Sequence, residues 1–204
     1  MRLTVSFAVT IAVALAVAFA MGRLSAQEPK PSCAMCKATY IPARELAAYE
    51  AASRASNVID QQVRSVDVGK TKLQIALVHR GKLDAPAPRS VAEHDLVTEV
   101  YYVLSGSGTN RTGPDIVDPQ RRPPDDRAVL SLNGPGSNGT DLRGADTQEL
   151  RPGDVLVIPA GTGHQFTKID DQITYLMVRV DPDKVVPLMD EAASRAYLEQ
   201  NRPR

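Results

Sequence analysis

A glycine-rich turn near residue 160 presents a histidine that could do chemistry. Residues 153–164 begin at a glycine and continue through five residues that favour a strand. Pro159 interrupts that run, and a Gly-Thr-Gly turn then delivers His164. A histidine at the start of a returning strand can point into a barrel, where its neutral ring nitrogen is a good ligand for a divalent transition metal. A core histidine bonded to a backbone carbonyl would fit the same pattern, so both interpretations stay open.

Two cysteines, Cys33 and Cys36, form the second group with chemical potential. A c-type haem would need a histidine directly after the second cysteine, where this chain has Lys37, and a structural zinc site would need two further ligands nearby. A thioredoxin-like redox pair opens a helix after a strand, whereas this pair follows Pro29 and Pro31 before any periodic segment. We therefore expect a local disulfide or inert thiols, with a metal or redox role as the alternative.

Length and composition describe an ordinary globular protein. The chain has 204 residues, 43% of them hydrophobic, and its 24 basic groups balance 24 acidic groups. Zero net charge leaves no basic surface of the kind that nucleic acids require. The sequence also lacks the dinucleotide and phosphate-loop patterns and the nucleophile elbow of serine hydrolases. We expect no nucleic-acid partner and a small-molecule ligand or substrate.

The first 26 residues are typical of an export signal. Arg2 precedes a run at 7–21 that is apolar except for Thr10 and too short for a membrane helix. Residues 24–26, Leu-Ser-Ala, supply the small side chains that a signal peptidase accepts. The pattern predicts cleavage before Gln27 and a periplasmic or secreted protein. An uncleaved membrane anchor is the alternative, and the membrane would be contacted only through this segment.

The elements that must position His164 are short strands with helices at the two ends. Residues 42–54 and 184–200 are rich in helix formers. Runs rich in β-branched and aromatic residues occur between them, at 58–68, 71–79, 97–104, 154–158 and 172–180. Residues 109–148 are rich in Pro, Gly, Asp and Asn, and we expect a long mobile loop there. This order favours an all-β fold, an antiparallel barrel or jelly roll.

Residues 153–164 resemble the second cupin motif, which is Gly, five residues, Pro, one residue, Gly, two residues and His. Residues 99–106, Glu-Val-Tyr-Tyr-Val-Leu-Ser-Gly, resemble the second half of the first cupin motif, and the two occur in the family's order. The family usually has Asn four residues after the histidine, where this chain has Lys168. The chain is thus similar to the cupin superfamily, as a single-domain exported protein with an incomplete first motif. The resemblance extends over about 58–181 and implies a double-stranded β-helix, or jelly-roll barrel.

The resemblance implies a metal held by two histidines and a glutamate of the first motif and one histidine of the second. In this chain the glutamate is Glu99, the second-motif histidine is His164, and His94 stands for the second histidine of the pair. The first histidine of the pair falls on Ala92, which cannot bind a metal. His79, inward on the preceding strand, could fill that vacancy.

The alternation of side chains along a strand leaves two adjacent candidates, His94 and Asp95, for one of the metal ligands. His94 and Glu99 are five residues apart, so a regular strand would point them to opposite faces unless a bulge or bend near Leu96 restores the match. On strict parity Asp95 would join Glu99 instead. We favour His94, so the predicted metal ligands are His94, Glu99 and His164.

Two imidazoles and one carboxylate with open positions suit Fe(II) first, and also Mn, Ni, Cu or Zn. Open positions let a small substrate and dioxygen or water bind together, which makes a metal-dependent oxygenase-type enzyme the first hypothesis. Tyr101 shares the strand phase of Glu99 and is a candidate proton donor, although an aromatic residue that only lines the barrel would look the same. The alternative function is a non-catalytic cupin that binds a small ligand or sugar.

The wall of the barrel opposite the predicted metal ligands is expected to be apolar. Apolar side chains on that wall suggest a small substrate with apolar character; they are Val155, Val157, Phe166, Tyr175 and Met177.

We expect a signal peptide at 1–26, a tail and helix at 27–57, the barrel at 58–181 and a C-terminal helix at 182–204. The chain could form a homodimer.

Overall fold

The computed structural model describes residues 30–201. The predicted signal peptide lies outside the described residues. The chain divides into two compact units, 1–34 and 35–204, and every element below belongs to the second. No helix within the described part is long and apolar enough to cross a membrane.

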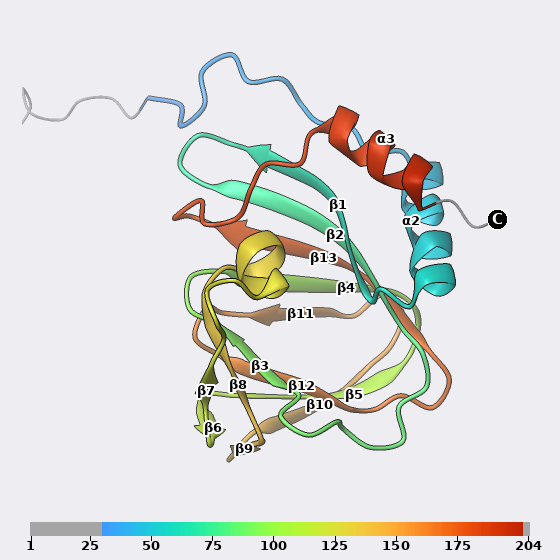
Figure 1. The fold of residues 1–204 in the computed structure, drawn as a ribbon, viewed down its shortest axis with the longest axis vertical. Helices are drawn as coiled ribbons and strands as arrows, with labels where there is room; N and C mark the ends of the chain where they lie inside the picture. Colours follow the sequence, from blue (N-terminus) through green and yellow to red (C-terminus); the bar gives the residue numbers. More distant parts are fainter. Residues whose placement is uncertain (1–29, 202–204) are drawn as a thin grey trace, which may run out of the picture. The chain divides into compact units, whose positions relative to one another are not determined.

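Two antiparallel sheets form the body of the second unit between residues 35 and 201 (Figure 1). In spatial order, the first sheet contains β1 (Asp60–Asp67), β2 (Lys72–Arg80), β13 (Ile173–Asp181), β4 (Thr98–Gly106) and β11 (Val155–Ile158). The second contains β10 (Asp146–Leu150), β5 (Gly108–Gly113), β12 (Gly163–Lys168), β3 (Val91–His94), β8 (Gly136–Gly139) and β7 (Gln120–Arg121). A small additional pair joins β6 (Asp115–Val117) to β9 (Asp141–Arg143).

The winding of the chain between the sheets defines the fold. From β2 to β5, and again from β10 to β13, successive strands alternate between the two sheets. This is how a jelly-roll barrel is wound, and it confirms the predicted all-β class. Inward-facing side chains of both sheets form one core, because alternate residues of each strand point the same way. Its buried members are Ala76, Val78, Tyr101, Val103, Leu150, Ile158, Phe166, Ile169, Ile173, Tyr175 and Met177.

Helices α2 (Ala43–Ser56) and α3 (Glu191–Gln200) lie together at the β1 side of the first sheet (Figure 1). The ring of Tyr49 stacks on that of Tyr197 with centroids 5.8 Å apart, which joins the two helices. The second helix is shorter than the predicted 184–200. Its start is set by Asp190, whose side chain accepts a hydrogen bond from Ala193 N, while Pro187 precedes it in non-helical chain.

The segment 109–148 is folded, which corrects the expectation of a long mobile loop. It contains the strands from β5 to β9, the start of β10, and a single-turn π-helix, η1 (Ala128–Asn133). Its glycines allow close packing. A Cβ atom on Gly136 would lie 2.1 Å from the carbonyl oxygen of Glu93, and one on Gly139 would lie 2.2 Å from Ile116 Cγ2. The glycine content therefore reflects close backbone approach as well as turns.

A bend between β3 and β4 places the predicted first-motif residues. β3 ends at His94 and β4 begins at Thr98, so the chain bends around Leu96 as predicted. The carbonyl of His94 accepts a hydrogen bond of 2.7 Å from Gly161 N, and Asp95 N donates to Pro135 O. The bend is thus fixed by the turn that precedes β12, and both His94 and Glu99 are buried.

The end of β4 offers a test of this packing. Gly106→Ala should lower the free energy of unfolding by at least about 2 kcal/mol more than Gly144→Ala, because overpacking against backbone is added to the left-handed penalty. Both glycines have positive φ, +72° and +58°, but a Cβ on Gly106 would lie 1.9 Å from Gln172 O and one on Gly144 meets nothing within 4 Å. Urea unfolding of both variants measures the difference, and equal losses would contradict the packing described for this turn.

Candidate metal centre

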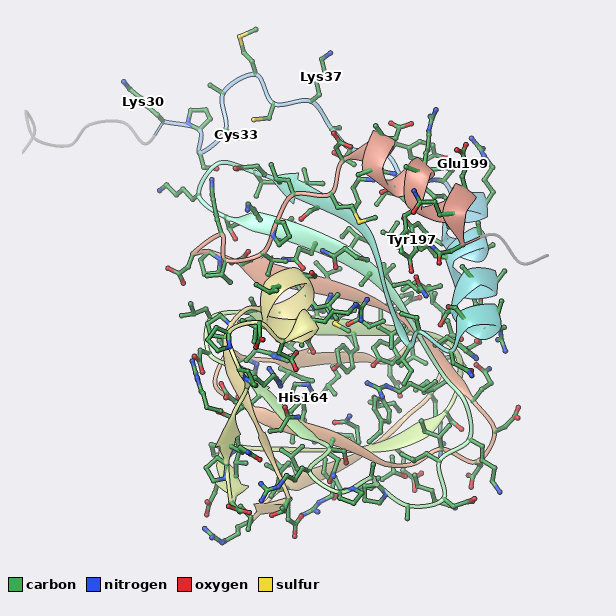
Figure 2. All side chains as sticks on the ribbon, viewed as in Figure 1. Lys30, Cys33, Lys37, His164, Tyr197 and Glu199 are labelled. Atoms are coloured by element: carbon green, nitrogen blue, oxygen red, sulfur yellow. The ribbon has the colours of Figure 1, made fainter. Side chains whose placement is uncertain are left out.

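The three predicted ligands converge inside the barrel. His94 Nε2 lies 3.4 Å from Glu99 Oε1, and His164 Nε2 lies 3.5 Å from Glu99 Oε2. All three side chains are buried, with ligand atoms within 4.8 Å of one another, and His164 lies among the interior side chains in Figure 2. Ligands about 2.1 Å from one ion are about 3 to 4 Å from each other, so this donor set fits a single divalent metal.

Each ligand is placed by a different strand. His94 ends β3, Glu99 is the second residue of β4, and His164 is the second residue of β12. Strands β3 and β12 pair so that Ala92 lies directly opposite His164, and residues in such a pair share a face. Ala92 accordingly lines the cavity at the position predicted for a further histidine.

The two alternative ligands lie elsewhere. His79 Nδ1 is hydrogen-bonded to Thr174 Oγ1 at 2.8 Å, and His79 lines a separate small cavity beside Arg54. It does not fill the place left by Ala92. Asp95 forms an ion pair with Arg121 outside the cluster. The structure therefore brings His94, and not Asp95, to Glu99.

Glu99 is fixed by a buried arginine that the sequence argument missed. Arg179 Nε donates to Glu99 Oε1 at 3.1 Å, and the same guanidinium pairs with Asp60 and donates to Gln62 Oε1 at 3.2 Å. Burial raises the pKa of Glu99, but the neighbouring His94 and Arg179 more than offset this and lower the pKa to about 2. The carboxylate therefore stays ionised at neutral pH. The signal in the sequence was a charged residue in the inward phase of β13, two residues after Met177.

Both histidines are neutral, which is the charge state that a metal ligand requires. Burial lowers the pKa of His94 to about 3 and also lowers the pKa of His164, so both rings are neutral near pH 7. His164 Nδ1 lies 3.2 Å from the carbonyl oxygen of Thr162. A ring N–H donated there leaves the Nε2 lone pair free on the side of Glu99. The carbonyl contact that would explain a structural histidine thus also orients a ligand.

Tyr101 lies beside the cluster with its proton retained. Its hydroxyl donates a 2.8 Å hydrogen bond to Glu99 Oε2, and its ring meets that of His164 edge-on with centroids 6.5 Å apart. Burial, followed by the charge of Glu99, raises the pKa of Tyr101 well above its ordinary value. Tyr101 is therefore a hydrogen-bond donor in the cavity wall, and its catalytic role stays a prediction.

The cavity at the cluster has a volume of about 360 Å³ and a polar lining. The expected apolar wall is wrong in most of its members. Val155 and Val157 are 61% and 57% exposed on the outside of β11, because the inward phase of that edge strand belongs to Leu156 and Ile158. Phe166 and Tyr175 belong to the core, and Met177 alone of the five lines this cavity. Charged residues contribute much of the remaining lining; they are Asp60, Arg80, Glu99, Arg122, Asp126 and Arg179.

Comparison with known proteins gives one family model and several solved structures. Residues 139–203 match the family model described as AraC-like ligand binding domain. A search of curated proteins found no match. Among solved structures, the chain is similar to a Bacillus halodurans protein (14% identity, TM-score 0.41, covering 74% of this chain and 86% of that one). It is also similar to a cupin protein from Bacteroides fragilis (21%, 0.32, 53% and 65%) and to the DMSP lyase DddQ from Ruegeria pomeroyi (16%, 0.34, 59% and 48%).

The barrel has the jelly-roll fold that the resemblance of the two motifs to cupins implied. The alternating strands form the jelly roll, and the two partial motifs meet in its interior as the superfamily resemblance implied. The chain has a single jelly-roll barrel, short helices at its N-terminal and C-terminal sides, and alanine at the position where the resemblance to the cupin superfamily implied a further histidine.

Removal of the buried arginine tests what holds Glu99. Arg179→Met should cost about 3 to 5 kcal/mol of unfolding free energy, because it leaves the buried carboxylate of Glu99 and the partly buried carboxylate of Asp60 without their cation. Arg143→Met is the matched control, since Arg143 pairs with Asp115 on the surface with 66% of its side chain exposed and should show little change. Denaturant unfolding compares the two, and similar small losses in both would show that Arg179 is not the partner on which Glu99 depends.

Proposed function

We propose that this protein is a metal-dependent cupin enzyme that acts on a small organic anion in an oxygenase-type reaction. The observation that carries the proposal is the meeting of two neutral imidazoles and one ionised carboxylate in a cavity of about 360 Å³. His94, Glu99 and His164 would hold the ion, which would supply Lewis-acid or redox chemistry at its open positions. Dioxygen uptake by the Fe(II)-loaded protein separates an oxygenase from other cupin reactions.

The charges around the cavity favour an anionic substrate. Three arginines and three carboxylates line it, so a bound divalent ion adds net positive charge. Arg80 and Arg122 have no carboxylate within ion-pair distance among the described residues. Arg80 is held by Tyr175, whose hydroxyl accepts from its Nε at 3.2 Å, and lies over the ring of Phe166 at 5.2 Å. Its other guanidinium nitrogens remain available for a carboxylate.

The remaining residues would orient the substrate and hold a proton. Tyr101 carries its proton on Oη and keeps it against Glu99, within the same cavity wall as His164. A substrate oxygen or carbanion that replaces Glu99 as the acceptor would receive that hydrogen bond. Arg179 lies behind Glu99, and its charge keeps the carboxylate ionised.

We also propose that the protein lies outside the cytoplasm. Both cysteines are disulfide-bonded, a state that is typical of exported proteins. The apolar run at residues 7–21 supports the same compartment.

A second candidate function is a non-catalytic small-ligand binder. Arg122 Nη1 lies 3.4 Å from His94 Nδ1. A donor at Nδ1 favours the tautomer with its proton on Nε2, and that tautomer cannot bind a metal there. The match of residues 139–203 to a ligand-binding family model fits this alternative as well. Metal content decides between the two.

Metal analysis of histidine variants tests the site directly. Wild-type protein should bind about one equivalent of a divalent transition metal, and His164→Ala should lose it because removal of one of the histidine ligands weakens the hold on the ion against water. His79→Ala is the control, since His79 lies outside the cluster and its variant should keep the metal. Elemental analysis gives the metal content and circular dichroism confirms the fold. Wild-type protein that retains less than about a tenth of an equivalent of Fe, Mn, Ni, Cu and Zn would support the binder instead.

Malonate and its neutral diamide test the charge preference. Metal-loaded wild-type protein should bind malonate at least about tenfold more tightly than malonamide, and Arg80→Gln should remove most of that difference because a charged hydrogen bond is lost. Arg143→Gln, on the surface, should leave it unchanged. Isothermal titration calorimetry measures both ligands, and equal affinities for acid and amide in wild-type protein would argue against an anionic substrate.

A further inference from the structure

The π-helix η1 brings one more polar side chain into the cluster. Asn133, the last residue of η1, is buried, and its Nδ2 atom lies 2.6 Å from His94 Nε2 and 3.2 Å from Glu99 Oε1. The helix is the yellow coil of Figure 1. It belongs to the segment 109–148, which neither cupin motif covers. π-Helical turns are rare and occur often at functional sites.

The position of the amide leaves the His94 ligand atom free. Asn133 Nδ2 is also 3.2 Å from His94 Nδ1, and an atom that is close to both ring nitrogens lies beside the ring. An atom on the line of the Nε2 lone pair would be much farther from Nδ1. The amide therefore flanks His94 without using the lone pair that would bind an ion.

The other end of the same amide has no partner. Asn133 Oδ1 is buried and accepts no hydrogen bond among the described residues. An unsatisfied buried carbonyl costs about 1 to 3 kcal/mol. A half-turn about the last side-chain bond exchanges the amide oxygen and nitrogen, which occupy nearly the same volume.

A cation in the cluster would reverse the favoured orientation of the Asn133 amide. Without an ion, the NH₂ end faces Glu99 and donates to it. An ion on the Nε2 lone pair of His94 would lie about 3 Å from the present position of that amide, and a rotation of the Asn133 side chain would bring an amide oxygen within the roughly 2 Å of a coordination bond. The oxygen would then be satisfied by the ion, and Ala92 would no longer leave the centre one ligand short.

We propose that Asn133 Oδ1 is a fourth metal ligand, supplied by η1 in place of the histidine that Ala92 replaces. This inference rests on the proposed metal-dependent function. It also restricts the identity of the metal, because a ligand set of two nitrogens and two oxygens suits Mn(II) or Fe(II) better than the softer ions.

Three variants separate a ligand from a hydrogen-bond donor. As a ligand, Asn133→Ala should weaken Mn(II) binding by at least about tenfold, and Asn133→Asp should bind as tightly as wild-type protein or more tightly, because it offers a charged oxygen. Asn138→Ala is the matched control, since Asn138 lines the same cavity but bonds to Arg122 and the backbone of Val91. Mn(II) titration followed by electron paramagnetic resonance gives each dissociation constant, and thermal unfolding confirms that each variant is folded.

Other outcomes of these measurements would overturn the assignment of Asn133 as a ligand. If Asn133→Ala binds Mn(II) as well as wild-type protein or more tightly, the amide is a donor that competes with the ion, and the inference is overturned while the proposed function stands. If wild-type protein binds no Mn(II), Fe(II) or Co(II), both fail together. The visible spectrum of the Co(II)-loaded protein gives a second readout. It should differ between wild type and Asn133→Ala at saturation, and identical spectra would also overturn the assignment.

Discussion

The buried contact between Arg179 and Glu99 is the interaction on which the site depends. A carboxylate in the interior of a barrel would normally be protonated, and a protonated carboxyl group is a poor metal ligand. Arg179 removes that difficulty because its charge lies 3.1 Å from Glu99 Oε1 and is itself compensated by Asp60 on β1. The hydroxyl of Tyr101 takes the other oxygen. The direction and charge of Glu99 are thus set before any ligand arrives.

The two partial motifs are joined through backbone as well as through side chains. The carbonyl of His94 accepts from Gly161 N, so the bend after β3 and the turn before β12 hold each other in place. The separation of the two histidines therefore follows from main-chain geometry, with ring centroids 5.1 Å apart. A site built in this way needs little reorganisation on binding, because its ligands belong to strands.

Local patterns in the sequence predicted the three residues of the cluster, while long-range packing decided the rest of the site. His94, Glu99 and His164 could be found because motif spacing and strand parity are local properties, and the bend near Leu96 was required by parity itself. Asn133 could not be found, because η1 lies in a segment whose glycines suggested a loop and in fact allow close packing at Gly136 and Gly139. The inward phase of β11 was misassigned for a related reason, since four residues at a sheet edge carry apolar side chains on both faces.

The row formed by Asp60, Arg179 and Glu99 crosses the first sheet from β1 to β4 and has an evolutionary consequence. Replacement of Arg179 alone leaves two carboxylates without their cation, whereas a joint replacement of all three residues by neutral residues of similar volume can be nearly neutral for stability. The three positions are therefore expected to be epistatic. A descendant of this barrel that gives up Glu99 would keep Arg179 paired with Asp60, whereas a descendant that loses Arg179 first would pass through an unstable intermediate with two uncompensated carboxylates.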